Sequence, residues 1–322
     1  MKQNPLFIGI ITLLMLASCS TETAQPYKAR ELIIASDYLE AKDTLLFRAF
    51  AKKNAIRILI YTLTSDKIIS TIRNKAANSG IDLVMLKSLY DVSKLNKREI
   101  LHHIDLTVKK SQEAIHYSSW KYNYVGFGID PYIIAFELNS DNKVKIYNDL
   151  TRFYHINKLE SNHYPPMLAP ILKKLNKARG NQWIKDCLDH SISKPIPGDS
   201  LLNDSLFLRL PVLTTLSDFK LNKDSNHLYK NKSFLLPNER SKGTFYNLRS
   251  IAIVNQASNY TIALDFIGFC LDEKNNVKLN DALNTYSIYS RQSDFRKYSP
   301  SAEELIPYYS IIEHFKIKLE SN

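Results

Sequence analysis

Two short polar segments in this sequence have side chains suited to a charged ligand: Ser36-Asp37-Tyr38 and Lys87-Ser88. Carboxylate and phenolate oxygens, as on Asp37 and Tyr38, are the donors that a hard metal cation prefers. An ammonium group such as that of Lys87 suits an anion instead. Asp37 also has an ordinary structural interpretation, because aspartate is a common N-cap of a following helix.

No catalytic motif accompanies these residues. The sequence has no GxSxG, HExxH, P-loop or CxxC pattern. His102 and His103 are adjacent, so on a helix their imidazoles point to different faces, which fits a solvated surface better than a metal site. The sequence therefore does not favour an enzyme.

Alternating strands and helices position the two segments. Apolar runs at 31–35, 56–61 and 82–86 are typical of buried strands, and two helical segments separate them. We expect one helical face at Leu45, Leu46, Ala49 and Phe50, and another at Ile68, Ile69 and Ile72. This order predicts a parallel sheet with right-handed crossovers, whose ligands bind at the carboxyl ends of the strands. Asp37, Tyr38 and Lys87 all follow such ends.

A later stretch predicts a buried strand and a helix. Ser250 to Val254 is strand-like, and a stripe of apolar residues follows at helical spacing: Ala263, Leu264, Ile267, Cys270 and Leu271. Cys187 and Cys270 are expected to be two small buried thiols, because a disulfide between them would join segments that we place in different lobes.

The N-terminus predicts export and lipid attachment. Lys2 precedes an apolar stretch, Leu6 to Ala17, that is short for a permanent membrane anchor. Leu16-Ala17-Ser18-Cys19 resembles the lipobox of bacterial lipoproteins, which implies cleavage before Cys19 and its acylation. Residues 1–18 would then be a signal peptide and 19–30 a polar tether that holds the protein in the cell envelope, outside the cytoplasm. An ordinary secretory signal with a chance cysteine is the alternative.

The net charge of +11 comes from dispersed lysines, with no basic block. Dispersed charge indicates a solvated basic surface. Together with an exported location, it argues against nucleic acid as a partner.

Several segments resemble the periplasmic ferric-iron-binding proteins of bacteria, the solute-binding components of ABC importers. PNERSKGTFYNLRSIAIV is similar to their PNxxxxGTHxNxSGxGV segment, ANSGIDLVML to NSPADVxxT, and Tyr147-Asn148-Asp149-Leu150 to YxDL. The resemblance spans about residues 30 to 290. It implies an α/β, two-lobed type II periplasmic-binding-protein fold in which each lobe is a central sheet flanked by helices. Residues 31–130 and 248–322 would form lobe one and 131–247 lobe two, joined by hinge strands.

The resemblance also implies a ligand set. Tyr38 stands where the family has a tyrosine in its first-strand loop, with Asp37 in the place of a histidine. Ser161-Asn162-His163-Tyr164 resembles a second-lobe segment whose tyrosine is a ligand in one branch. Tyr38 and Tyr164 are therefore the expected ferric ligands; a packed aromatic is the alternative for Tyr164.

Three departures weaken the case for iron. The family's consecutive Tyr-Tyr pair aligns with Thr214-Thr215, whose neutral hydroxyls do not replace two phenolates. Lys87 stands where some members have a glutamate, and Asp130 where many have an arginine. An oxyanion held by Lys87, Thr214, Thr215 and main-chain N–H groups at a helix start is the alternative ligand.

These observations predict a monomeric, lipid-anchored solute-binding protein that captures its ligand between two lobes and presents it to an ABC permease. A scaffold or interaction lipoprotein that kept the fold and lost its ligand is the rival prediction.

Overall fold

The structure is a computed structural model of the chain. It describes residues 30–75, 79–96, 100–104, 116–119, 123–138, 145–147, 149, 169–173, 180, 182, 212–225, 229–237, 243–290 and 304–311. The predicted signal peptide, Cys19, Tyr164 and Cys187 lie outside these residues.

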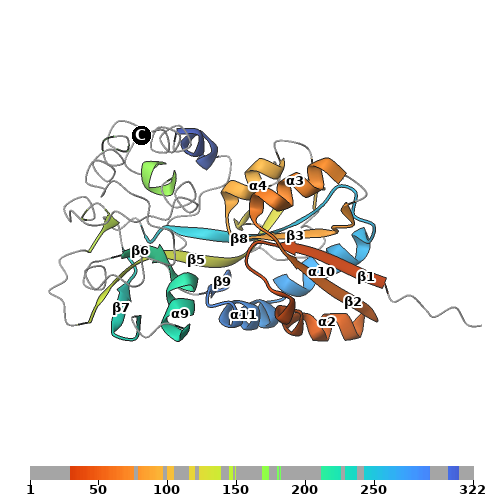
Figure 1. Cartoon of the computed structure of the whole chain (residues 1–322), viewed down its shortest axis with the longest axis horizontal. Helices are drawn as coiled ribbons and strands as arrows, with labels where there is room; N and C mark the ends of the chain where they lie inside the picture. Colours follow the sequence, from red (N-terminus) through yellow and green to blue (C-terminus); the bar gives the residue numbers. More distant parts are fainter. Residues whose placement is uncertain are drawn as a thin grey trace, which may run out of the picture.

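The first half of the described chain forms the predicted parallel strands. β1 (Arg30–Ser36) pairs in parallel with both β2 (Ile56–Thr62) and β3 (Leu83–Leu86), which gives the order β2-β1-β3. η1 (Ala41–Phe47) and α2 (Arg48–Lys53) connect β1 to β2, and α3 (Ser65–Lys75) precedes β3. Helix α4 (Leu89–Asn96) follows β3. In Figure 1, α3 and α4 cover one face of this sheet, and α2, α10 and α11 lie on the other.

One predicted helical face is wrong in part. Leu45 is 71% exposed and Ala49 is exposed, while Phe47 and Phe50 are buried and pack against Phe266. The segment is a 3₁₀-helix as far as Phe47 and becomes an α-helix only at Arg48, so Leu45 and Leu46 lie in a helix of three residues per turn. The α-helical spacing assumed from the sequence does not apply there. In α3, by contrast, Ile68, Ile69 and Ile72 are buried as predicted.

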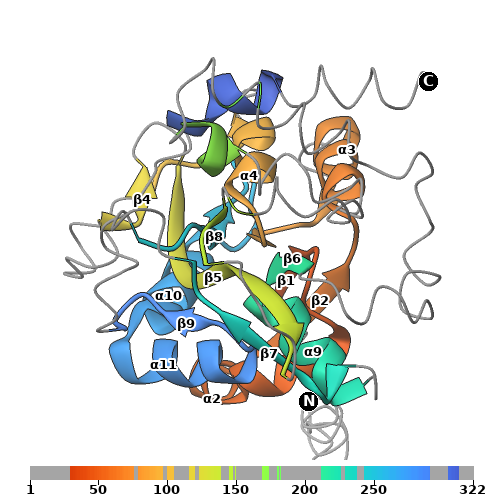
Figure 2. The same cartoon turned by 90° about the vertical axis from the view of Figure 1, so that its left-hand side faces the viewer.

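A single long strand, β5 (Tyr124–Glu137), belongs to two sheets. Its first half pairs antiparallel with three strands: β8 (Tyr246–Ile253) and the short strands β4 (Ser118–Ser119) and β9 (Tyr286–Ser287). Strand β8 also pairs with β3. Its second half pairs with β6 (Val212–Thr215) and β7 (Lys232–Leu235). We call these the first and second sheets. Figure 1 shows β6, β7 and helix α9 (Leu216–Ser225) at the far end of β5 from β1 and β2, and Figure 2 views the molecule from that end.

The described residues form two hydrophobic clusters. The larger cluster includes most of the buried strand residues of the first sheet and continues into the second through Ile134 and Leu213. The smaller cluster lies under α9 and consists of Ile133, Ala135, Leu216 and Phe219. Strand β5 is common to both.

The late strand and helix form largely as predicted. β8 begins at Tyr246, four residues before the predicted start, because its pairing with β5 continues as far as Pro131. Helix α10 (Tyr260–Leu271) buries Ala263, Phe266, Ile267, Cys270 and Leu271, and the predicted Leu264 is only partly buried. Cys270 is a free thiol, and burial raises its pKa.

Helix α11 (Glu273–Ala282) supports an irregular point in β5. The register of β5 against β8 shifts between Gly126 and Gly128, and the carbonyl of Phe127 accepts hydrogen bonds from Asn276 Nδ2 at 2.8 Å and Asn280 Nδ2 at 2.9 Å. Thr285 Oγ1 donates to Asn280 Oδ1 at 2.7 Å, so the amide orientation is set. These neutral side chains replace the ladder bonds that a bulge interrupts.

Gly128→Ala should destabilise the fold, because the added Cβ would overlap Asn280 Oδ1. We expect a loss of about 1–3 kcal/mol in the free energy of unfolding, measured by urea denaturation. Asn280→Ala should also destabilise, since it removes a donor from the Phe127 carbonyl. The double variant should lose less stability than the sum of the two single losses, because Asn280→Ala removes the side chain that the Cβ added by Gly128→Ala would overlap. Strict additivity would contradict this packing.

Candidate functional site

Asp37 joins three elements at the carboxyl ends of β1 and β3. Its Oδ2 accepts a hydrogen bond from Ser65 Oγ of α3 at 2.9 Å, and its Oδ1 accepts one from the Lys87 N–H at 3.0 Å. It does not cap η1, which begins after Glu40 and has a reciprocal contact between Glu40 and Asp43. Burial raises the pKa of Asp37, and the bonds from Ser65 and Lys87 oppose that rise.

Tyr38 presents a buried hydroxyl with no hydrogen-bond partner among the described residues. The guanidinium carbon of Arg249 lies 4.5 Å from its ring centroid. Burial raises the pKa of Tyr38 well above its usual value, and the nearby Arg249 only partly opposes this. Without a metal ion the phenol is therefore neutral, and binding a ferric ion would require displacement of its proton.

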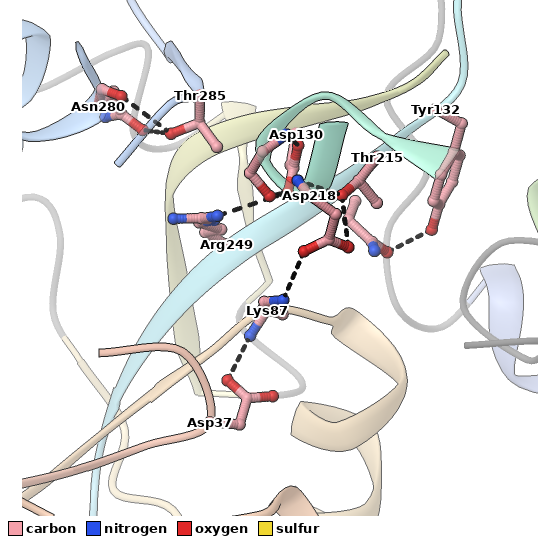
Figure 3. Close-up of polar contacts among 11 residues, drawn as sticks. Asp37, Lys87, Asp130, Tyr132, Thr215, Asp218, Arg249, Asn280 and Thr285 are labelled. Atoms are coloured by element: carbon pink, nitrogen blue, oxygen red, sulfur yellow. Dashed lines mark hydrogen bonds and ion pairs between the residues drawn. The ribbon is translucent and has the colours of Figure 1, made fainter. Parts of the chain in front are cut away.

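Lys87 forms an ion pair across the two sheets. Its Nζ lies 3.1 Å from Asp218 Oδ1 of α9, and the two side chains are 31% and 25% exposed. Figure 3 shows Lys87 between Asp37 on one side and Asp218 on the other, with its main-chain N–H on Asp37 and its ammonium on Asp218.

The chain's own side chains occupy the start of α9. Thr215 Oγ1 accepts from the Asp218 N–H at 3.2 Å and donates to Asp218 Oδ2 at 2.8 Å, as in a helix cap. The N–H and Oγ of Ser217 donate to the two oxygens of Asp130, at 3.0 and 2.6 Å. A helix N-terminus favours a negative group, and here Asp130 is that group.

Asp130 is also paired with Arg249 of β8. The Nη2–Oδ2 distance is 3.5 Å, and the side chains are 3% and 2% exposed. Burial raises the pKa of Asp130, while Arg249 and Ser217 act in the opposite direction. Arg249 Nε is buried without a hydrogen-bond partner in the described part of the chain.

The structure thus brings together five of the seven residues predicted to bind the ligand: Asp37, Tyr38, Lys87, Asp130 and Thr215. Thr214 neighbours Thr215 on β6, so its side chain points to the opposite face of the strand. Tyr164 lies outside the described residues. Within those residues, no group of three or more histidine, cysteine, aspartate or glutamate side chains could hold a metal ion.

Three residues of the cluster were missed from the sequence: Ser217, Asp218 and Arg249. Thr215-Leu216-Ser217-Asp218 has the spacing of a helix-capping segment, which would have placed Asp218 beside Thr215. Arg249 interrupts an apolar strand, and a buried arginine requires an acidic partner. Both signals were present in the sequence.

A second carboxylate adjoins Asp37. Asp91 of α4 lies 3.8 Å from Lys94 Nζ and is buried near Asp37. Burial, and then the charge of Asp37, raise the pKa of Asp91 to about 7, against the effect of Lys94.

Solved structures with a similar fold include iron-binding proteins and an ABC transporter protein. A Trichodesmium protein in complex with iron and citrate has a TM-score of 0.73 at 18% identity, over 90% of this chain and 98% of that chain. The ferric binding protein from Campylobacter jejuni has a TM-score of 0.73 at 16% identity, over 89% and 99%. An ABC transporter structure from Clostridium perfringens has a TM-score of 0.65 at 15% identity, over 90% and 99%.

These likenesses establish the fold, which is the two-lobed type II periplasmic-binding-protein fold expected from the sequence. At such low identity they establish the fold alone. No protein-family model and no curated protein sequence matches this chain.

Asp91 should make stability depend on pH. The pKa of Asp91 in the folded chain is raised above the usual 3.8. Its contribution to the free energy of unfolding is therefore fully present below about pH 4 and is lost as pH rises through about 7. Between pH 4 and 8, ionisation of Asp91 should lower the free energy of unfolding of the wild type by on the order of 2–4 kcal/mol, measured by urea unfolding. Asp91→Asn should abolish this decrease. Burial also raises the pKa of Asp37, so Asp91→Asn should retain part of the pH dependence of stability. Asp66→Asn is the control, because Asp66 also pairs with Lys94 but is 87% exposed. Equal pH profiles for wild type and Asp91→Asn would contradict the assignment.

Arg249→Met should leave Asp130 buried without its cation. We expect a loss of about 3 kcal/mol at pH 8, measured by urea unfolding. The loss should be smaller at pH 5, where Asp130 can take up a proton. Adding Asp130→Asn should recover part of the loss at pH 8 by removing the unpaired charge. A double variant as unstable as the sum of the two single variants would show that the residues do not interact.

Proposed function

We propose that this chain is the solute-binding component of an ABC importer, held at a membrane by acylated Cys19, and that it captures its ligand between the loops after β1 and β3 and the start of α9. The observation that carries the proposal is the convergence of polar groups from both sheets. Asp37 and Lys87 come from the first sheet, Asp130 lies where β5 passes between the sheets, and Thr215 and Asp218 come from the second.

Capture requires no bond to be made or broken. A ligand that contacts both groups of residues stabilises the closed arrangement, and this closed form is what a permease would receive. The iron-binding and ABC transporter structures of the same fold support this assignment over an enzyme.

The donor set favours a hard cation over an oxyanion. Lys87 is already bonded to Asp218, and Ser217 to Asp130, so an incoming anion would meet two carboxylates at the start of α9. The Tyr38 hydroxyl, which has no partner among the described residues, is a suitable donor to a ferric ion, with Tyr164 as the proposed second phenolate. The Trichodesmium and Campylobacter jejuni proteins, which bind iron, agree with this choice.

The second candidate function is a scaffold of the cell envelope that has the fold and no ligand. The Lys87–Asp218 and Ser217–Asp130 contacts favour it, because the chain satisfies its own polar groups where a ligand would bind. The proposed location on the outer side of a membrane is common to both functions. No helix in the described part of the chain is long and apolar enough to cross a bilayer.

Thermal melting with and without ferric citrate separates the two functions. A ligand at a hundredfold excess over its dissociation constant should stabilise the chain by ~2.7 kcal/mol and raise the melting temperature. Phosphate and citrate alone are the anion arms, and we expect little shift with either. No shift with any of the three would favour the scaffold, and a shift with phosphate would reverse the choice of ligand class.

Tyr38→Phe tests the metal site in two ways. Without iron, the variant should be as stable as wild type or up to about 2 kcal/mol more stable, because it removes a buried hydroxyl that lacks a partner. With iron, it should lose the phenolate charge-transfer absorbance and most of the melting shift. Tyr61→Phe, at an exposed tyrosine, is the control. Full absorbance in Tyr38→Phe would remove Tyr38 from the site.

A further inference from the structure

The two sheets share β5, and their other contacts among the described residues include an ion pair between the end of β3 and α9. Helix α9 packs on β5 and β6 over its own small hydrophobic cluster. Among the ion pairs of the described residues, Lys87–Asp218 is the one that links the end of β3 to α9. It joins positions 131 residues apart in the sequence.

Both partners are held in place on their own side. The Lys87 N–H donates to Asp37 Oδ1, so the main chain at the end of β3 is fixed before the ammonium reaches across. Asp218 is held by Thr215, which bonds both its N–H and its Oδ2 and leaves Oδ1 for Lys87. Asp218 therefore loses little side-chain freedom when the pair forms, whereas the Lys87 stem is ordered by the pair itself.

We propose that the Lys87–Asp218 pair is a latch that holds the two sheets closed in the absence of a ligand. This inference rests on the proposed capture between the sheets and adds a resting state to it. The empty protein is mainly closed, and a ligand enters after the pair has opened. Lys87 and Thr215, the residues that the sequence assigns to an oxyanion, thus both contact Asp218 instead.

The latch is ionic and partly exposed, so salt weakens it. Removing either charge should raise the ratio of open to closed molecules by about two- to fivefold, the range for ion pairs of this exposure. Lys87→Arg keeps the charge and should stay closed. Lys94→Met is the matched control, because Lys94 pairs with Asp66 and Asp91 within the first sheet's helices.

Distances between two spin labels report the ratio directly. Leu45 on η1 and Leu221 on α9 are exposed, so Leu45→Cys and Leu221→Cys place one spin label on each side. The distance between the labels is measured by pulsed electron–electron double resonance on the full chain. The background carries Cys187→Ser; Cys270 is buried, and mass spectrometry verifies two labels per chain.

We expect wild type at low salt to show mainly the short distance, with more of the long distance as salt rises. Lys87→Met and Asp218→Asn should each shift the population to the long distance at low salt, and the double variant should shift it no further. Thermal melting verifies that each variant is folded.

Identical distance distributions for wild type, Lys87→Met and Asp218→Asn would overturn the latch, as would a wild type that is fully open at low salt. Because the labels are read without ligand, either result leaves capture to be judged by the ferric citrate melts. A failure of those melts leaves the latch measurement intact.

Discussion

The structure depends on one strand that serves two sheets. β5 pairs with β8 as far as Pro131 and with β6 from Tyr132, so it changes partners at a single step. Asp130 lies at that step, and it is buried between Ser217 at the start of α9 and Arg249 on β8. A charge at such a position is costly unless both neighbours contact it, and this requirement fixes α9 against the crossing strands.

The same requirement explains why the sequence predicted the fold better than the site. The parallel order β2-β1-β3 follows from apolar runs and turn residues, which act locally. Asp130 could be recognised as a charge reversal relative to the family it resembles, but its partner lies 119 residues away, at Arg249. Pairing at that distance cannot be derived from local periodicity. The 3₁₀ start of η1 was missed for another reason, because its apolar residues fit either helical spacing.

The polar residues of the candidate site are not a preformed cage. Lys87, Ser217 and Thr215 already donate to carboxylates of the chain, whereas the hydroxyl of Tyr38 has no partner in the described residues. A ligand at the candidate site would therefore compete with bonds within the chain at Lys87, Ser217 and Thr215, and would form a new bond at Tyr38. Thr214 shows the limit of a prediction by alignment, since strand alternation separates it from the residue next to it.

Two neighbouring points of β5 are held by different kinds of contact. At the bulge, the neutral amides of Asn276 and Asn280 hold the Phe127 carbonyl, and no proton or salt ion alters their charge. Near the crossing, aspartate, lysine and arginine make the contacts. Changes in acidity or ionic strength therefore act on the contacts near the crossing and leave those at the bulge unchanged. One strand of fourteen residues thus carries both contacts that are insensitive to the solution and contacts that respond to it.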